Sequence, residues 1–523
     1  MLIFLKKKFY DSFFEYSKSV SLKIQSFTFF VDSEKPEIEK YGTSKIKPMK
    51  KFLFLASFLA FACTPIFAQK KPNVIVILMD DLGYGDLSCY GASQYQTPNL
   101  DQMAKNGVRL TNFLSAQAVC SASRAGLLTG CYPNRIGISG ALFPNSPVGI
   151  NKDEETIAEI LKANGYATGI FGKWHLGDSE RFLPTQHGFD EYLGIPYSND
   201  MWPVHYDGTR NATNQRKDFP ELPLIRGSKP ERFIKTLDDQ AQLISILTQE
   251  SIKFIEKNKA KPFFVYMPHP MPHVPINASA AFKGKSKQGL YGDVMLEMDW
   301  SVGEILKTLK RLKIDQNTLV IFTSDNGPWQ NFGNHAGSAG GLREAKGTSF
   351  EGGQRVPFIA QWNGHIQGGK VNNGLASNID LLPTICAITN SKLPVKKIDG
   401  VNVISLLKDE EKAEPRKEFL YYYRKNNLEA VRKGQWKLVL AHPGRTYEGF
   451  MPGQDGFPGK GREDFPFPEA LYDLRRDPGE RYDVQSLYPT VLAELKQLAE
   501  KAREELGDDL TQRKGTGNRA AGQ

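Results

Sequence analysis

Four side chains with hard oxygen ligands follow two of the most apolar runs in the chain. One pair comes directly after residues 74–79 and the other just after residues 319–323. Carboxylate and amide oxygens are the ligands that divalent cations such as Ca²⁺ and Mg²⁺ prefer. Either pair alone is typical of a capped turn, but two pairs that both end apolar strands indicate a metal site. Its candidate ligands are Asp80, Asp81, Asp325 and Asn326.

Basic side chains occur in three further segments. Lys173 and His175 lie two residues apart after the apolar run 167–171, so both can face the same side of an extended segment. Lys346 lies in a segment that ends in Gly-Gly. Each alone is as typical of a solvated lysine or a structural histidine. With Arg124 these lysines would form a buried group of cations, which is repulsive unless an anion and carboxylates balance it.

A cysteine opens the sequence Cys-Ser-Ala-Ser-Arg at residues 120–124, and an apolar run follows up to Gly130. The pattern predicts a helix that begins at Cys120, and a helix N-terminus directs backbone N–H groups toward an anion. A small residue at the start of an ordinary helix, with a solvated serine and arginine, explains the pentapeptide as well. The decision depends on whether the rest of the chain supplies a metal site and anion-binding cations.

The motif segments lie between predicted strands and helices that alternate along the chain. Continuous apolar runs predict strands buried on both faces, hence a mostly parallel sheet flanked by helices in an α/β domain. The polar segments follow strand C-termini, where open α/β sheets place their sites. Thr97 is expected to cap the next helix, with Pro98 in its first turn. Residues 195–235 are expected to be a long surface insertion. We expect strands near residues 74–79, 108–113, 167–171, 263–267 and 319–323, and helices near 155–164, 237–257 and 293–312.

The pattern changes after about Asp409. Residues 419–423, 428–432 and 436–440 are expected to be antiparallel strands joined by turns, and residues 444–468 a Gly- and Pro-rich loop. A terminal helix is expected near 489–506, followed by a disordered tail. The sequence thus predicts a catalytic domain at residues 69–410 and a smaller C-terminal α+β subdomain at residues 411–523.

The net charge excludes a nucleic-acid partner. The chain has 523 residues and a formal net charge of +9. Residues 1–68 hold 11 Lys and 6 Asp and Glu, so only about +4 belongs to the rest. A surplus of that size on a large chain is no signature of nucleic-acid binding.

The N-terminal region indicates export. Met49 begins a basic start, a short apolar run and small residues, which together are typical of a secretory signal at residues 49–68. Residues 1–48 are then an over-extended gene start, and a cytoplasmic tail before an anchor helix is the alternative. The run is too short for a stable membrane span. We expect a secreted or periplasmic protein with no integral membrane segment in the mature chain, and Cys63 leaves lipoprotein anchoring open.

Cysteine usage argues against a disulfide scaffold. The chain has five cysteines; removing the one in the signal region leaves four, and setting Cys120 aside as a modified residue leaves three. An odd remainder without dense spacing is not a disulfide framework. Cys89 and Cys131 are one pairing that the sequence leaves open.

As a set, these motifs resemble the type I, formylglycine-dependent sulfatases, and within them the arylsulfatase A and N-acetylgalactosamine-6-sulfatase group. The resemblance rests on the Cys-x-Ala-Ser-Arg segment and on residues 172–177, 187–191 and 325–353, in that order along the chain. It implies an alkaline-phosphatase-like fold and hydrolysis of sulfate esters, from sulfated sugars or aryl sulfates. One departure is Ala122, where many relatives have proline. That change bears on whether the maturing enzyme accepts the segment.

The resemblance also implies a role for each matching residue. A formylglycine-generating enzyme would oxidise Cys120 to an aldehyde whose hydrate attacks sulfur. Ca²⁺, with Mg²⁺ as the alternative, would be held by the four oxygen ligands and by the modified Cys120. The sulfate-binding cations would be Lys173, Lys346 and Arg124. Asp325 would help to deprotonate the hydrate, His175 would take a second proton, and His273, in Pro-His-Val-Pro, would bind the substrate and protonate the leaving oxygen. His269 competes with His273 by spacing.

Two other functions stay open at this point. A phosphonate or phosphodiester hydrolase shares the fold and the formylglycine, and a glycan-binding relative with a dead site is the rival from another class. The natural sugar is not specified by the sequence. Asp200, Trp202, His205 and residues 329–335 are candidates for a sugar pocket, with ordinary loop packing as the alternative.

Overall fold

A ten-stranded mixed sheet lies at the centre of the chain, for which a computed structural model describes residues 71–210 and 215–523. The strand order is β12-β2-β11-β9-β1-β8-β4-β5-β6-β7, and the five from β9 to β5 are all parallel. The expected α/β class is confirmed, with antiparallel strands only toward the two edges. The strands are β1 (Asn73–Met79), β2 (Val108–Leu110), β4 (Ala167–Phe171), β5 (Glu191–Gly194), β6 (Leu222–Arg226), β7 (Lys229–Ile234), β8 (Phe263–Pro268), β9 (Thr318–Ser324), β11 (Phe358–Gln361) and β12 (Lys370–Asn372).

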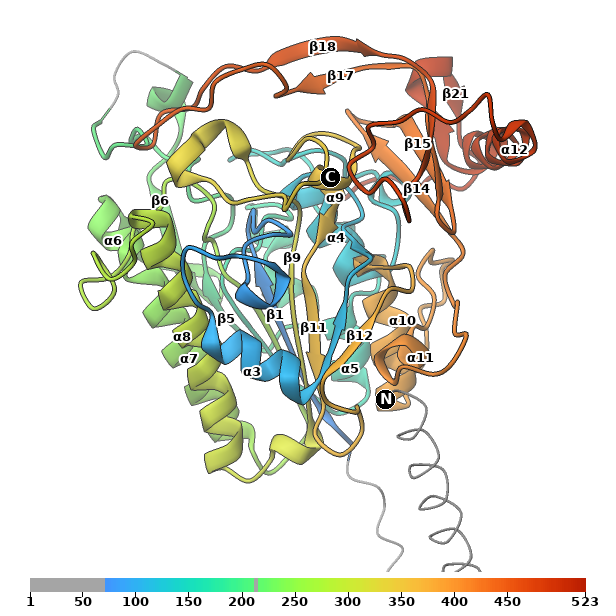
Figure 1. The fold of residues 1–523 in the computed structure, drawn as a ribbon. Coiled ribbons are helices and arrows are strands. Elements are labelled where there is room, and N and C mark those ends of the chain that lie inside the picture. Colours follow the sequence, from blue (N-terminus) through green and yellow to red (C-terminus); the bar gives the residue numbers. More distant parts are fainter. Residues whose placement is uncertain (1–70, 211–214) are drawn as a thin grey trace, which may run out of the picture. The chain divides into compact units, whose positions relative to one another are not determined.

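Helices cover both faces of this sheet (Figure 1). Every residue of β1 is buried, and its side chains alternate between two apolar cores. Ile75 and Ile77 lie in the core that also includes residues of α3 (Pro98–Asn106), α7 (Leu243–Asn258) and α8 (Leu290–Arg311). Val74 and Val76 lie in the core of α4 (Cys120–Thr129), α5 (Ile157–Ala163) and α10 (Leu381–Thr389). Burial on both faces explains the uninterrupted apolar run of this strand.

Two local expectations fail near the second strand. The strand expected at residues 108–113 divides, because β3 (Phe113–Leu114) pairs with β10 (Arg355–Val356) and β13 (Ala376–Ser377) in a separate sheet. Thr97 occupies the N-cap position of α3, but its hydroxyl bonds Ser88 instead of the helix. The carboxylate of Asp299 accepts the first free N–H groups of α3 in its place.

The segment expected to be a surface insertion is instead part of the core structure. Trp202 within it is fully buried. Strands β6 and β7 extend the sheet beyond β5. The long helix expected next is interrupted after α6 (Leu237–Ala241), and α7 follows. Polar and aromatic composition suggested a loop here, but the aromatic residues pack into the apolar core.

The C-terminal region forms a four-stranded antiparallel sheet in the order β14-β15-β16-β19, with α12 (Pro489–Leu506) against it. The expected strands and terminal helix are confirmed. The Gly- and Pro-rich loop expected at 444–468 is wrong in part, because β17 and β18 form a hairpin that crosses above the main sheet in Figure 1. The strands are β14 (Glu418–Tyr423), β15 (Asn427–Lys433), β16 (Trp436–Val439), β17 (His442–Thr446), β18 (Arg462–Phe467) and β19 (Ala470–Asp473).

The last residues, expected to be disordered, are ordered in the structure. Arg519 forms an ion pair with Glu154 at 2.7 Å. Gly522 forms an antiparallel bridge with Gly149. These contacts reach across more than three hundred residues, so a polar, Gly-containing tail sequence does not reveal them. The boundary near residue 410 between the two expected domains stays a prediction.

The expected gene start, the signal segment and Cys63 all lie outside the described residues. Across residues 71–210 and 215–523, the structure contains no helix with the length and apolar character to cross a bilayer. The four cysteines in these ranges are free thiols, so Cys89 and Cys131 are not paired.

Candidate functional site

The oxygen ligands expected from the sequence meet at one edge of the sheet. β1 and β9 are parallel neighbours with Met79 opposite Ser324, so the residues that follow both strands emerge together. One carboxylate oxygen from each of Asp80, Asp81 and Asp325 lies within 4.8 Å of the others. The Asp81 N–H donates to Asp325 at 3.2 Å, and the Asn326 amide donates to Asp81 at 2.7 Å. The four candidate ligands therefore form one buried cluster.

Three cations from distant segments pair with these carboxylates. Lys173 lies 2.5 Å from Asp80, and Lys346 lies 2.7 Å from Asp81. Arg124 lies 2.8 Å from Asp325 and 3.5 Å from Asp80. All six side chains are buried or nearly so. Three carboxylates and three permanent cations balance, so a divalent cation and a dianion can enter together without leaving net charge in the interior.

The cluster fits a hard divalent cation on its own geometry. Within the described part of the chain, Asp80 Oδ1 and Asn326 Oδ1 are buried without a hydrogen-bond partner. Such orphaned acceptors are costly unless a cation or water satisfies them. Burial and the neighbouring charge of Asp80 raise the pKa of Asp325 to about 7, although Arg124 opposes this. A cation among these oxygens would relieve that repulsion, and an all-oxygen set suits Ca²⁺ or Mg²⁺.

Cys120 is the first residue of α4 and lies beside this cluster, in the wall of a cavity. The N-cap residue Val119 makes no side-chain cap, and the Ala122 N–H donates to the Gly140 carbonyl at 3.2 Å. Burial raises the pKa of the Cys120 thiol, and Lys173 and Lys346 only partly offset this. The thiol is therefore protonated and is a poor nucleophile as it stands. A buried, inert thiol at a helix N-terminus fits a residue that must be converted before it can react.

The histidines of the site differ in their surroundings. His175, at a φ of 63°, places Nε2 2.8 Å from the Leu142 carbonyl, while Nδ1 is buried without a partner in the described chain. Burial, with Lys173 and Arg124, lowers its pKa well below the usual value. His273 lines the cavity, with Nδ1 2.5 Å from the Val274 carbonyl and Nε2 3.5 Å from Asp81.

His269 lies away from the cavity. Its Nε2 lies 3.1 Å from the hydroxyl of Ser301 on α8, and burial lowers its pKa to about 3. The structure thus brings His273, and not His269, to the cavity and the acidic cluster.

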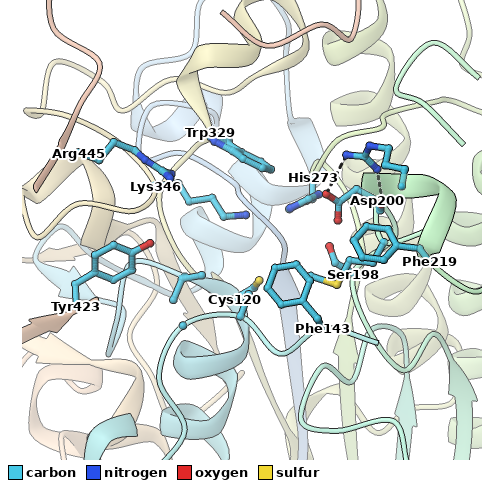
Figure 2. Close-up of a pocket in the computed structure, with 15 residues that line it drawn as sticks. Cys120, Phe143, Ser198, Asp200, Phe219, His273, Trp329, Lys346, Tyr423 and Arg445 are labelled. Carbon is cyan, nitrogen blue, oxygen red and sulfur yellow. Dashed lines mark hydrogen bonds and ion pairs between the residues drawn. The ribbon is translucent and has the colours of Figure 1, made fainter. Parts of the chain in front are cut away.

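The cavity above Cys120 has a volume of about 490 Å³, which is enough for a sugar unit. Figure 2 shows Lys346, Tyr423 and Arg445 on one wall and Asp200 and Phe219 on the other, with Trp329 between them. Of the residues expected to form a sugar pocket, Asp200 and Trp329 line it. Trp202 lies in the core, and His205 packs against the rings of Tyr206 and Phe457.

Several lining residues were not expected from the sequence. Ser198 accepts from Lys173 at 3.0 Å, and Arg216 lies 3.6 Å from Asp200. Phe143 stacks on Phe219 at a centroid distance of 6.3 Å and is 57% exposed. None of them belongs to a motif: Ser198 and Phe143 lie in irregular segments and Arg216 in a short 3-10 helix, Gln215–Asp218, so only the tertiary fold brings them to the cavity. Arg445 is a clearer case, because it comes from β17 in the C-terminal region.

Residues of the C-terminal region also form hydrogen bonds to the segment around Lys346. The Tyr447 hydroxyl donates to the Lys346 carbonyl at 2.8 Å, and its backbone N–H donates to Glu344 at 2.9 Å. Buried Lys437 donates to the Ser349 carbonyl at 2.8 Å. The position of Lys346 therefore depends on residues more than eighty positions further along the chain.

Comparison with known proteins gives consistent matches. A family model described as Sulfatase matches residues 72–391, and one described as the C-terminal region of aryl-sulfatase matches residues 415–519. Arylsulfatase A of Bos taurus is 38% identical over 454 residues, 82% of this chain and 87% of that protein. N-acetylgalactosamine-6-sulfatase of Mus musculus is 39% identical over 442 residues, 79% of this chain and 82% of that protein.

A solved relative shows the same architecture. The sulfatase PsFucS1 from Pseudoalteromonas superimposes with a TM-score of 0.75 at 28% identity, and the match covers 87% of this chain and 94% of that one. The expected alkaline-phosphatase-like fold is thereby confirmed, with the difference that the large sheet is mixed toward its edges.

Proposed function

We propose that this chain, which belongs to the sulfatase family and is a sulfuric ester hydrolase, acts on sulfated carbohydrates. The sulfate would be removed in the cavity beside Cys120. One observation carries the proposal. The Cys120 thiol, the three-carboxylate cluster and the cations Lys173, Lys346 and Arg124 meet in one buried place at a cavity of sugar size. This arrangement suits an anionic sulfate ester group bound together with a divalent cation.

Two groups would complete this site. A Ca²⁺ or Mg²⁺ ion held by Asp80, Asp81, Asp325 and Asn326 would supply Lewis-acid stabilisation of negative charge. A formylglycine at position 120, made by a maturing enzyme, would supply a hydratable aldehyde in place of the thiol. The oxygens of Asp80 and Asn326 that make no hydrogen bond support the metal, and the place of Cys120 at the start of α4 in the cavity wall supports the aldehyde.

The chain's own cations would bind and orient the sulfate. Lys346 lines the cavity, whereas Lys173 and Arg124 lie deeper, against the carboxylates. Their charges would stabilise negative charge on the transferring group, which is usually the largest contribution in such displacements. The sulfate would enter first, and the alcohol part of the ester would remain in the outer cavity among Trp329, Phe143 and Asp200.

The two histidines of the site would handle protons. His273 lies at the cavity wall with Nε2 directed at Asp81, so it is placed to hold a proton near the departing oxygen. His175 is buried with Nδ1 free and Nε2 fixed by the Leu142 carbonyl, which makes Nδ1 the atom that accepts a proton. Asp325 would assist by accepting a proton at the position of Cys120.

The sugar substrate and the export route belong to the same proposal. The mouse relative is named for sulfated N-acetylgalactosamine, which supports a carbohydrate substrate. Export through residues 49–68, to the periplasm or outside the cell, would bring the enzyme to sulfated polysaccharides.

A rate comparison tests this function. Purified enzyme is assayed for sulfate release from a panel of sulfated mono- and disaccharides, from nitrophenyl sulfate, and from an aryl phosphodiester and an aryl phosphonate. We expect the sulfate esters to be the best substrates and Cys120→Ala to abolish their turnover. Faster hydrolysis of the phosphodiester or phosphonate would identify the rival hydrolase, and absence of any turnover by protein whose Cys120 carries the aldehyde would identify a binding protein.

A further inference from the structure

The cavity carries a cationic wall that the binding of a single sulfate does not use. We propose that Arg445 and Tyr423 form a second anion subsite, which binds a carboxylate or a second sulfate on the same sugar substrate. The inference rests on the proposed function, because it names the class of sulfated carbohydrate that the site accepts. That class is a sulfated oligosaccharide with a second acidic group near the scissile ester.

The wall is built around a glycine next to Lys346. Gly347 has a φ of 83°, and a Cβ placed on it would lie 2.9 Å from Arg445 Nη1 and 3.2 Å from the Tyr423 hydroxyl. The guanidinium and the phenol therefore meet directly over the backbone that follows Lys346. In Figure 2 both side chains extend from the C-terminal strands toward the cavity, on the same side of it as Lys346.

Arg445 is only weakly neutralised from outside the cavity. Its Nε donates to Glu463 at 2.5 Å, but Glu463 is 54% exposed and also pairs with Arg424 at 2.5 Å. Exposed ion pairs contribute little, and a guanidinium can exchange one for a better anion. The Nη1 group contacts the Tyr447 hydroxyl at 3.3 Å. Arg424 also pairs with Asp464, so the carboxylates near Arg445 on this side, Glu463 and Asp464, are both exposed at the surface.

The opposite wall also carries a cation, but a carboxylate of the same wall balances it. Asp200 and Arg216 pair with each other there, at 3.6 Å. Lys346 is already paired with Asp81, so Arg445 is the lining cation whose carboxylate partner lies at the surface. A dianionic substrate would therefore be oriented with its second acidic group toward Arg445, because the charge of Arg216 on the other side is already balanced by Asp200. Charge-assisted, bidentate bonds are what a guanidinium offers a carboxylate or a sulfate.

Four substrates and two matched variants test this subsite. The substrates are nitrophenyl sulfate, a neutral monosulfated disaccharide, a monosulfated disaccharide with a uronic acid, and a disulfated disaccharide without one. Arg445→Gln removes the proposed contact. Arg424→Gln is the control, because it removes an arginine from the same Glu463 but not from the cavity lining. For each variant, kcat/KM on the dianionic substrates is divided by kcat/KM on nitrophenyl sulfate.

We expect Arg445→Gln to lower this ratio by about 10–100-fold, mainly through KM, which is the scale of a hydrogen bond to a charged group. Arg424→Gln should leave it unchanged, and Tyr423→Phe should lower it by a smaller factor. A loss on the uronic acid substrate alone identifies a carboxylate site, and a loss on the disulfated one alone identifies a second sulfate site.

Equal losses on neutral and dianionic substrates would overturn the proposal, since Arg445 would then only support Lys346. An unchanged ratio in Arg445→Gln would also overturn it. If Arg445→Gln unfolds, the same ratio is measured for Arg445→Lys and Tyr423→Phe. Arg445→Lys keeps the positive charge but loses the paired N–H groups of the guanidinium. Failure of the proposed function would look different, because wild-type enzyme would then release no sulfate from any of the sugars.

Discussion

Arg124 donates from Nε to one oxygen of Asp325 at 3.0 Å and places Nη2 2.8 Å from the same oxygen, although 201 residues separate the two along the chain. Both side chains are fully buried. The arginine thereby joins the helix that begins at Cys120 to the strand end that carries the acidic cluster. Its charge also lies 3.5 Å from Asp80, so one guanidinium compensates two of the three carboxylates.

Replacing this arginine should destabilise the fold as well as the site. Arg124→Met removes the compensating charge and leaves Asp325 buried and unpaired, which typically costs about 3–5 kcal/mol. Thermal unfolding of the purified variant should occur at a clearly lower temperature. Arg311→Met is the control, since Arg311 pairs with Glu256 at the surface and such pairs contribute about 0–1 kcal/mol. Equal unfolding temperatures for wild type and Arg124→Met would contradict the account.

Metal content should depend on the acidic cluster. Elemental analysis of wild-type protein should give one Ca²⁺ or Mg²⁺ per chain, and added Ca²⁺ should raise its unfolding temperature by mass action. Asp80→Asn should lose both the bound metal and the effect of added Ca²⁺, because a ligand charge is gone. Asp153→Asn, at an exposed position, should behave as wild type. Unchanged metal content in Asp80→Asn, or full activity after thorough chelation, would count against the site.

Much of this site could be predicted from local sequence because strand ends are encoded locally. The buried run of β1 ends at Asp80 and that of β9 ends at Asp325, and parallel pairing then brings the two ends together. Cys120, Lys173 and Lys346 were expected at the site from family motifs. The apolar runs also indicated the α/β class.

The features that the sequence did not predict depend on contacts between residues far apart along the chain. Arg445 reaches the cavity only because the β17–β18 hairpin folds back over it, and nothing near residue 445 indicates that. The tail is ordered by Arg519 binding Glu154, 365 residues earlier. Thr97 was expected to cap a helix, but the distant Asp299 does so. Local propensity cannot report such partners.

The contribution of His273 to kcat should depend on how readily the leaving group departs without a proton. A sugar alcohol leaves reluctantly without a proton, whereas a nitrophenolate hardly needs one. His273→Ala should therefore lose about 10²–10⁴-fold of kcat on sulfated sugars, the usual contribution of general acid catalysis, and much less on nitrophenyl sulfate. Lys346→Ala should impair both substrates alike, because it contacts the sulfate. Equal slowing of both substrates by His273→Ala would exclude it as the acid.

A buried carboxyl should give stability a measurable pH dependence. Burial raises the pKa of Glu429 to about 7, so the folded protein keeps a proton there that the unfolded chain releases near pH 4.5. The stability that accompanies this proton is present at low pH and is lost as pH rises through about 7. Glu429→Gln cannot titrate. Its stability relative to wild type should therefore rise between pH 5 and pH 8, by at most about 3 kcal/mol. Unfolding midpoints measured across that range check this, and a constant difference would contradict it.

The modification state of Cys120 in active enzyme tests the central claim most directly. Enzyme that turns over sulfated sugars is digested, and the peptide that contains residues 120–124 is analysed by mass spectrometry. We predict an aldehyde or its hydrate in place of the thiol, in a fraction that tracks specific activity from one preparation to the next. Cys120→Ser should support at most one turnover. Full activity in a preparation whose Cys120 is entirely an unmodified thiol would contradict the account.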